Sequence, residues 1–176
     1  GDIVFDCGAN VGDLLLWFQN RKFEISYHAF EPSPEEFTLL KNNIGKHNSN
    51  QVALWNQSST LDFYISSQTA DSSLIEPKSY TNILQVDAKR LDGFIDGNIK
   101  LLKLEAEGGE LEVIEGAGEK INKIKYISAD LGPERGTDQE STFAPVSNLL
   151  KQKNFSMIEY NASRFTALFK NNDFVN

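Results

Sequence analysis

Ile3-Val-Phe-Asp6-Cys-Gly8-Ala-Asn10-Val-Gly12 is the stretch that decides the fold we expect for this 176-residue chain. An apolar run with two β-branched residues precedes an acid and a turn with two glycines, and residues 13–18 can continue as a helix. A loop between a strand and a helix directs backbone N–H groups at a ligand, and its glycines allow the ligand to approach closely. The stretch therefore predicts a nucleotide-type cofactor site at the start of the chain.

The composition is that of an ordinary globular protein, with 40% hydrophobic and 24% charged residues, and the length favours one domain over residues 1–176. The net charge is −8 and no run of Lys or Arg occurs, which argues against nucleic acid and anionic membranes as partners. No apolar run approaches the roughly 20 residues of a membrane span, and we find no signal peptide, so we expect a cytoplasmic location. Because the chain begins almost directly on a strand, an N-terminal lid element could be missing.

Strands and helices are expected to alternate after the first unit. We expect strands at residues 25–31, 51–55, 99–104 and 126–129, and helices at 34–43, 109–115 and 143–153. Ser33 and Glu36 have the spacing of a capping box, and Gly45 and Gly116 are stop signals. Two final strands, 155–159 and 164–169, have no helix between them. They predict an antiparallel pair at the edge of an otherwise parallel sheet.

Residues 56–98 interrupt this alternation. Residues 61–65 and 83–86 have the character of strands, which predicts a β-hairpin or ribbon insertion with a flexible segment at 70–74. Such a loop on a rigid scaffold can carry specificity or can be solvated filler, and the sequence leaves both interpretations open.

Acids follow the strands at the edge of the sheet where ligands of such folds bind. They are Asp6, Glu31, Glu105, Glu107 and Asp130. NAD and ATP carry anionic phosphates, whereas S-adenosylmethionine carries a sulfonium and an ammonium against one carboxylate, so an acid-lined site favours S-adenosylmethionine.

The spacing of the glycines agrees with that choice of cofactor. A dinucleotide G-x-G-x-x-G motif starting at Gly8 would need glycines where Asn10 and Asp13 stand. Glu31 lies 19 residues after Gly12, where a carboxylate can accept both ribose hydroxyls of either cofactor. A solvated acid at a strand end is the alternative for Glu31.

Several motifs together resemble the FkbM-type S-adenosylmethionine-dependent methyltransferases. They are Val4-Phe-Asp-Cys-Gly-Ala-Asn-Val-Gly12, Ala29-Phe-Glu-Pro-Ser-Pro34, Arg90-Leu-Asp92, Leu102-Lys-Leu-Glu-Ala-Glu-Gly108, Glu110-Leu-Glu-Val-Ile-Glu-Gly116 and Asp130-Leu-Gly-Pro-Glu-Arg-Gly136. The likeness continues to residues 164–169 and so covers essentially the whole chain. The Lys-x-x-x-Glu-Gly-x-Glu block makes it specific, and Glu105 departs from the family, which more often has Asp there.

The resemblance implies an α/β protein with the Rossmann-like class I methyltransferase fold and a mostly parallel seven-stranded sheet. It places S-adenosylmethionine, with S-adenosylhomocysteine as product, across the first loop. Asp6 and Glu105 would lie near the methionyl group, Glu31 on the ribose, and the backbone of Ala53 and Leu54 beside the adenine. The cofactor-binding residues implied are therefore Asp6, Gly8, Ala9, Asn10, Gly12, Glu31, Pro32, Ala53, Leu54 and Glu105.

The expected reaction is methyl transfer to a hydroxyl of a small molecule or sugar, for which a base would remove the hydroxyl proton. Asp130 and Glu107 are our catalytic candidates, although Glu107 could instead cap the helix that follows Gly109. The acids could also hold Mg²⁺, but nothing fixes their spacing, so we assign no metal. The alternative function is a non-catalytic S-adenosylmethionine-binding module within a larger assembly. The sequence does not indicate an oligomeric state.

Four other side chains have functional and structural interpretations. Arg135 could hold an acidic group of a substrate, and a pair with Glu134 or Asp138 is the safer prediction. The single Cys7 is expected to be a buried thiol, because no base or cation lies near it in the sequence. For His28 and His47 we expect structural or solvated roles.

Overall fold

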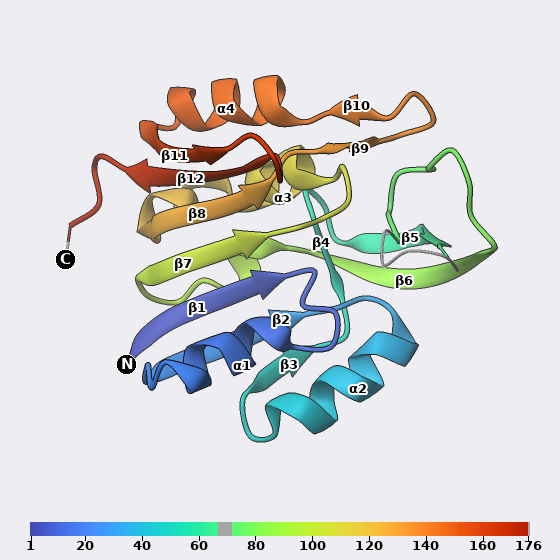
Figure 1. Ribbon diagram of the computed structural model, residues 1–176, viewed down its shortest axis with the longest axis horizontal. Coiled ribbons are helices and arrows are strands. Elements are labelled where there is room, and N and C mark those ends of the chain that lie inside the picture. The colour runs from blue at the N-terminus through green and yellow to red at the C-terminus, as the bar shows by residue number, and fades with distance from the viewer. Residues whose placement is uncertain (67–71, 176) are drawn as a thin grey trace.

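A seven-stranded sheet with the order β11-β12-β8-β7-β1-β2-β3 forms the centre of the computed structural model, which describes residues 1–66 and 72–175 (Figure 1). The strands are β1 (Asp2–Cys7), β2 (Ile25–Phe30), β3 (Asn48–Asn50), β7 (Ile99–Leu104), β8 (Ile124–Asp130), β11 (Phe155–Asn161) and β12 (Thr166–Asn171). The five strands from β3 to β8 are parallel, and β12 runs antiparallel to both β8 and β11. The Rossmann-like sheet and its antiparallel C-terminal pair are thus confirmed.

Helices cover the sheet because alternate residues of the central strands are apolar on both faces. Val4 of β1 packs with α1 (Asp13–Asn20) and α2 (Pro34–Ile44), whereas Phe5 packs in the larger core with α3 (Glu110–Gly116) and α4 (Phe143–Gln152). The chain order reverses at β1, between β2 and β7. Ligands of such sheets bind at the carboxyl ends of the strands beside this reversal.

Two of the predicted helix signals act differently from our expectation. The Ser33 hydroxyl donates a hydrogen bond to the Glu36 carboxylate and caps no backbone group, although α2 begins at Pro34 as expected. Gly116 lies in the last turn of α3, and the chain continues into the 3-10 helix η2 (Gly118–Lys123). A Cβ on Gly116 would lie 2.1 Å from the Trp55 carbonyl oxygen, so this glycine serves close packing rather than helix termination.

The strand predicted at residues 51–55 is present over Ala53–Trp55 only and belongs to a second, smaller sheet, whereas residues 48–50 form the edge strand of the main sheet. The polar segment Asn48–Asn50 forms β3 at the edge of the main sheet, where exposed side chains are tolerated. The apolar β4 (Ala53–Trp55) instead pairs with β6 (Asn82–Arg90) in parallel. The strand β5 (Ser59–Ile65) pairs with β6 in antiparallel fashion. The predicted ribbon is therefore present as part of a three-stranded sheet, β4-β6-β5.

The segment that was expected to be flexible, residues 70–74, lies partly outside the described residues. Within its described part, Ser73 exchanges two backbone hydrogen bonds with Tyr64 of β5.

Three further elements were not predicted: the 3-10 helix η1 (Leu91–Phe94) and the short antiparallel pair of β9 (Pro133–Arg135) and β10 (Glu140–Ser141). Among the described residues, no helix combines the length and the apolar character needed to cross a membrane.

Candidate functional site

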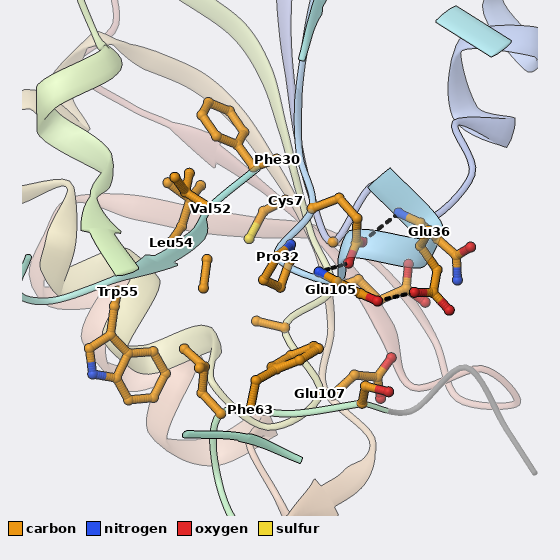
Figure 2. A pocket seen from close by; sticks show the side chains of 18 of the residues that line it. Cys7, Phe30, Pro32, Glu36, Val52, Leu54, Trp55, Phe63, Glu105 and Glu107 are labelled. Atoms are coloured by element: carbon orange, nitrogen blue, oxygen red, sulfur yellow. Dashed lines mark hydrogen bonds between the residues drawn. The ribbon is translucent and has the colours of Figure 1, made fainter. Parts of the chain in front are cut away.

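A cavity of about 400 Å³ lies at the carboxyl ends of β1, β2 and β7 and extends to the small sheet. Figure 2 shows that its side chains are segregated: Val52, Leu54 and Trp55 gather at one end, and Glu36, Glu105 and Glu107 at the other. We call these the apolar end and the acidic end. Five of the described residues that line the cavity are acids and one is a lysine: Asp13, Glu31, Glu36, Glu105, Glu107 and Lys103.

Glu31 follows β2 and is held in place by two backbone groups. Its Oε2 accepts a hydrogen bond from the N–H of Asn10, and its Oε1 accepts one from the N–H of Ser33, both at 2.9 Å. Burial raises the pKa of Glu31 to about 7, and these two N–H groups oppose the rise. Each carboxylate oxygen keeps acceptor capacity for a ligand, because a carboxylate has about four acceptor sites.

Lys103 is the charged residue of the cavity that the sequence analysis did not predict. Its Nζ lies 2.5 Å from Glu105 Oε2, 3.3 Å from Asp6 Oδ1 and 2.9 Å from the Gly8 carbonyl oxygen. A lysine at an alternating position of a strand resembles a solvent-facing one. Its place within the Lys-x-x-x-Glu-Gly-x-Glu block was the only signal in the sequence that could have identified it.

The side chain of Asp6 lies behind Lys103 and has no exposed surface. Its Oδ2 accepts a hydrogen bond from the Tyr27 hydroxyl, and its Oδ1 makes no hydrogen bond among the described residues. Burial raises the pKa of Asp6 to about 6 although the Lys103 charge opposes this. Burial also opposes the charge of Lys103, yet the pKa of Lys103 is raised because Asp6 and Glu105 lie beside it. These three side chains form one ion cluster.

The apolar end of the cavity is formed by β4, β5 and the segment that follows the undescribed residues. Ala53 and Phe63 belong to the core of the small sheet, and Trp55 and Leu74 pack against that core. Val52 and Leu54 complete the wall toward β1 and β2. This end offers a mostly apolar surface for a flat, uncharged group.

The loop between β7 and α3 brings Glu107 to the edge of the cavity. Glu107 has a positive φ of 49°, which is uncommon for a residue with a side chain. The buried carboxylate of Glu110 accepts hydrogen bonds from the N–H groups of Ala106 and Gly108. Glu110 thus holds the loop that precedes α3 and does not cap the helix, which has no side-chain cap, and the side chain of Glu107 faces the cavity.

Asp130 lies in a second hollow beside the cavity. This hollow is about 380 Å³, lies at the ends of β7, β8 and β12, and shares Lys103 and Glu105 with the cavity. Asp130 Oδ1 accepts a hydrogen bond from the N–H of Gly132 at 3.1 Å, and burial raises its pKa. The two candidate bases, Glu107 and Asp130, therefore line different hollows that share Lys103 and Glu105.

Most of the predicted cofactor-binding residues line the cavity: Gly8, Asn10, Glu31, Pro32, Ala53, Leu54 and Glu105. Asp6, Ala9 and Gly12 do not line it and lie behind its wall. Ala9 packs in the core beneath α1 and α2. A Cβ on Gly12 would come within 3.0 Å of both Ile44 and Leu40, so this glycine permits α2 to pack against the loop.

Arg135 pairs with a residue that was not predicted. Its guanidinium contacts both carboxylate oxygens of Glu112, at 2.7 and 2.9 Å, and donates to the Gly108 carbonyl. The prediction of a pair with Glu134 or Asp138 was wrong, because β9 lies alongside the start of α3 and brings Arg135 there. Cys7 is buried as expected, and burial raises its pKa.

Neither histidine lines either hollow. The ring of His28 contacts Phe5 of β1, and that of His47 contacts Tyr27. In the described part of the chain, no group of three or more His, Cys, Asp or Glu side chains has an arrangement that could hold a metal ion.

Comparison with known sequences identifies similar proteins. A family model described as the methyltransferase FkbM domain matches residues 6–157. The 31-O-demethyl-FK506 methyltransferase FkbM of Streptomyces tacrolimicus is 43% identical over 47 residues, which are 27% of this chain and 18% of that protein. The 2-O-methyltransferase NoeI of Sinorhizobium fredii (strain NBRC 101917 / NGR234) is 22% identical over 171 residues, covering 84% of this chain and 70% of that protein.

Solved structures share the fold. Methyltransferase FkbM from Methylobacillus flagellatus KT superposes with a TM-score of 0.66 at 16% identity, over 97% of this chain and 43% of that one. The N-terminal domain of human METTL16 in complex with S-adenosylhomocysteine gives a TM-score of 0.51 at 14% identity, over 96% of this chain and 59% of that one. The chain thus spans less than half the length of the FkbM structure.

Proposed function

Because the chain belongs to the FkbM methyltransferase family, we propose that it binds S-adenosylmethionine in the cavity and transfers the methyl group to a hydroxyl of a small molecule or sugar. The observation that carries this proposal is the cavity itself, which has an apolar end and an acidic end at the switch point of the sheet. A nucleoside with a charged tail needs both kinds of surface.

The residues present fit the parts of this cofactor. The apolar end beside Ala53 and Leu54 would take the adenine. Glu31 would accept the ribose hydroxyls, since the Asn10 and Ser33 N–H groups fix its carboxylate and leave acceptor capacity. Glu105, with 43% of its side chain exposed, would face the ammonium of the methionyl group. Asp6 is buried and would not contact the cofactor itself. It would act by holding the side chain of Lys103 in place.

The charges of the cavity support a cationic cofactor over a phosphorylated one. The only basic side chain among the described lining residues is Lys103, and its charge is already matched by Asp6 and Glu105. The phosphates of NAD or ATP would meet the remaining acids without a compensating cation. A sulfonium and an ammonium are attracted by the same acids.

S-adenosylmethionine supplies an electrophilic methyl group when it is bound. The walls of the cavity would hold the reactants in line, which favours transfer between aligned groups. Glu107 at the edge of the cavity, or Asp130 in the adjoining hollow, would accept the proton of the hydroxyl. A hydroxyl acceptor is supported by the names of the two relatives, which refer to oxygen positions.

Calorimetric titration with S-adenosylmethionine, S-adenosylhomocysteine and NAD tests the cofactor. We expect both adenosyl ligands to bind, NAD to bind at least about 100-fold more weakly, and Glu31→Ala to weaken S-adenosylhomocysteine at least about tenfold because two charge-assisted hydrogen bonds are lost. Glu35→Ala, an exposed acid in the first turn of α2, is the matched control and should bind as the unmodified protein does. Binding of neither adenosyl ligand would overturn the proposal.

Turnover tests the reaction separately from binding. Methyl transfer from radiolabelled S-adenosylmethionine would be measured against a panel of hydroxylated small molecules and sugars. Transfer to one of them supports the proposed activity. Cofactor binding without transfer across the panel would instead favour a non-catalytic binding module.

A further inference from the structure

Residues 72–75, which we call the Ser73 segment, join the small sheet to the loop that carries Glu107. Ser73 is 2% exposed, and its backbone exchanges hydrogen bonds of 2.8 and 3.1 Å with Tyr64 of β5. Leu74 of the same segment packs against the core of the small sheet and lines the apolar end of the cavity. The segment is therefore fixed to the insertion by backbone pairing and by packing.

The hydroxyl of Ser73 makes the connection to the loop. Its Oγ donates a 2.7 Å hydrogen bond to the carbonyl oxygen of Glu107 and accepts a 3.0 Å hydrogen bond from the N–H of Ile75. Both the donor and an acceptor site of this buried hydroxyl are thus used. The contact links residues 34 positions apart in the sequence, one paired with β5 of the small sheet and the other in the loop that follows β7 of the main sheet.

The backbone around Glu107 is held from three directions. Glu110 holds the N–H groups on both sides of Glu107, and Arg135 holds the Gly108 carbonyl. Ser73 holds the carbonyl of Glu107 itself. A residue with a side chain is strained when its backbone is in the left-handed region. It stays in that conformation only where the surrounding structure holds it there. The Ser73 contact acts on the backbone of Glu107 directly.

The Ser73 segment thereby connects the two ends of the cavity. Figure 2 shows Phe63, at the apolar end, and Glu107, at the acidic end, along the same side of the cavity. Leu74 contributes to the wall at the first end, and the neighbouring Ser73 bonds the loop at the second. A ligand that presses on Leu74 therefore acts on the support of Glu107.

We propose that Ser73 is a positioning residue: it fixes where the Glu107 side chain enters the cavity and couples Glu107 to the group bound at the apolar end. This inference rests on the proposed function for the identity of the ligand, which we take to be an adenosyl compound. The link between Ser73 and the Glu107 loop rests only on the contacts of the Ser73 segment. The insertion then has a role beyond forming a wall, because it orients a candidate catalytic carboxylate.

Nuclear magnetic resonance on Ser73→Ala, with and without S-adenosylhomocysteine, tests both parts. In the ligand-free variant we expect the amides of Gly108 and Gly109 to exchange about tenfold faster, because the partly buried Glu107 carbonyl has lost its donor. On addition of the ligand, the Leu74 methyl resonances should shift as in the unmodified protein, and the shift of the Glu107 carboxyl resonance should fall several-fold. Ser73→Thr, which keeps the hydroxyl, should restore both quantities.

Thr81→Ala is the matched control, since the Thr81 hydroxyl also donates to a backbone carbonyl of the insertion, that of Ile65, and does not reach the Glu107 loop. Unchanged amide exchange and an unchanged Glu107 response in Ser73→Ala would overturn the inference, as would equal effects in the control. If the ligand shifts no resonance of the unmodified protein, the proposed function fails. In that case the amide exchange rates of the ligand-free variants still test whether Ser73 holds the loop that carries Glu107.

Discussion

Ion pairs and backbone N–H groups hold the side chains at the acidic end of the cavity, whereas packing within the small sheet holds those at the apolar end. The acidic end uses buried charges whose burial is costly unless each has a partner, as Asp6 and Lys103 show. The apolar end uses Phe63 and Trp55, which tolerate changes of shape more readily. Substitutions should therefore affect the two ends in different ways.

The largest effect is expected from Lys103→Met. This change leaves the buried Asp6 without its cation and Glu105 without its 2.5 Å partner, so we expect a loss of about 3–5 kcal/mol in the free energy of unfolding. Denaturant unfolding measures it. Lys100→Met is the matched control, because Lys100 lies on the same strand and pairs with Asp2 at the surface. The control should cost at most about 1 kcal/mol, and equal costs would contradict the account of the ion cluster.

A smaller effect, of no more than about 3 kcal/mol for each group, is expected from pH. Burial raises the pKa of Glu31 to about 7 and that of Asp6 to about 6, so the folded protein binds their protons more tightly than the unfolded chain does. These groups therefore make stability fall as the pH rises from about 4 to 7. Glu31→Gln should flatten part of this fall in denaturant unfolding, and Glu35→Gln should not. If the free energy of unfolding of Glu31→Gln falls as steeply with pH as that of the unmodified protein, Glu31 does not contribute to the pH dependence.

The smallest effect is expected at the apolar end. Phe63→Leu should weaken binding of S-adenosylhomocysteine about tenfold, because an aromatic face is replaced by a smaller aliphatic group of similar hydrophobicity. Phe23→Leu is the control, since Phe23 is 55% exposed and does not line the cavity. Calorimetry on both variants measures the difference. An affinity that is unchanged in Phe63→Leu would place the adenine elsewhere.

The parts of the fold that the sequence predicted are those with local signals. The repeated strand–helix units have hydrophobic periods and glycine turns of their own, so the elements from β1 to α2 and then β7, α3, β8, α4, β11 and β12 were expected almost at their observed places. The strand β3 was missed because Asn48–Asn50 are polar, and pairing at an edge depends on β2 rather than on the residues themselves. The additional pairing of β4 with β6 joins segments far apart in the sequence.

The candidate site shows the same division. Glu31 and the glycine loop could be found from motif spacing, and both line the cavity. Lys103 and the pairing of Arg135 with Glu112 were missed, because the first contact joins neighbouring strands and the second joins β9 to α3. The described lining of the cavity therefore contains one lysine in addition to the expected acids. The side chain of Lys103 reaches Asp6 from the neighbouring strand β7. This contact cannot be predicted from the residues at the strand ends alone.

The short β4 strand has a consequence for engineering. Residues 48–55 contribute β3 to the main sheet and β4 to the small one, so the insertion is attached by a shared strand segment rather than by two loops. Exchanging residues 56–98 alone between relatives would separate β6 from its parallel partner. A transplant meant to change acceptor preference must therefore carry residues 48–55 with it, and the recipient's β2 edge must accept them.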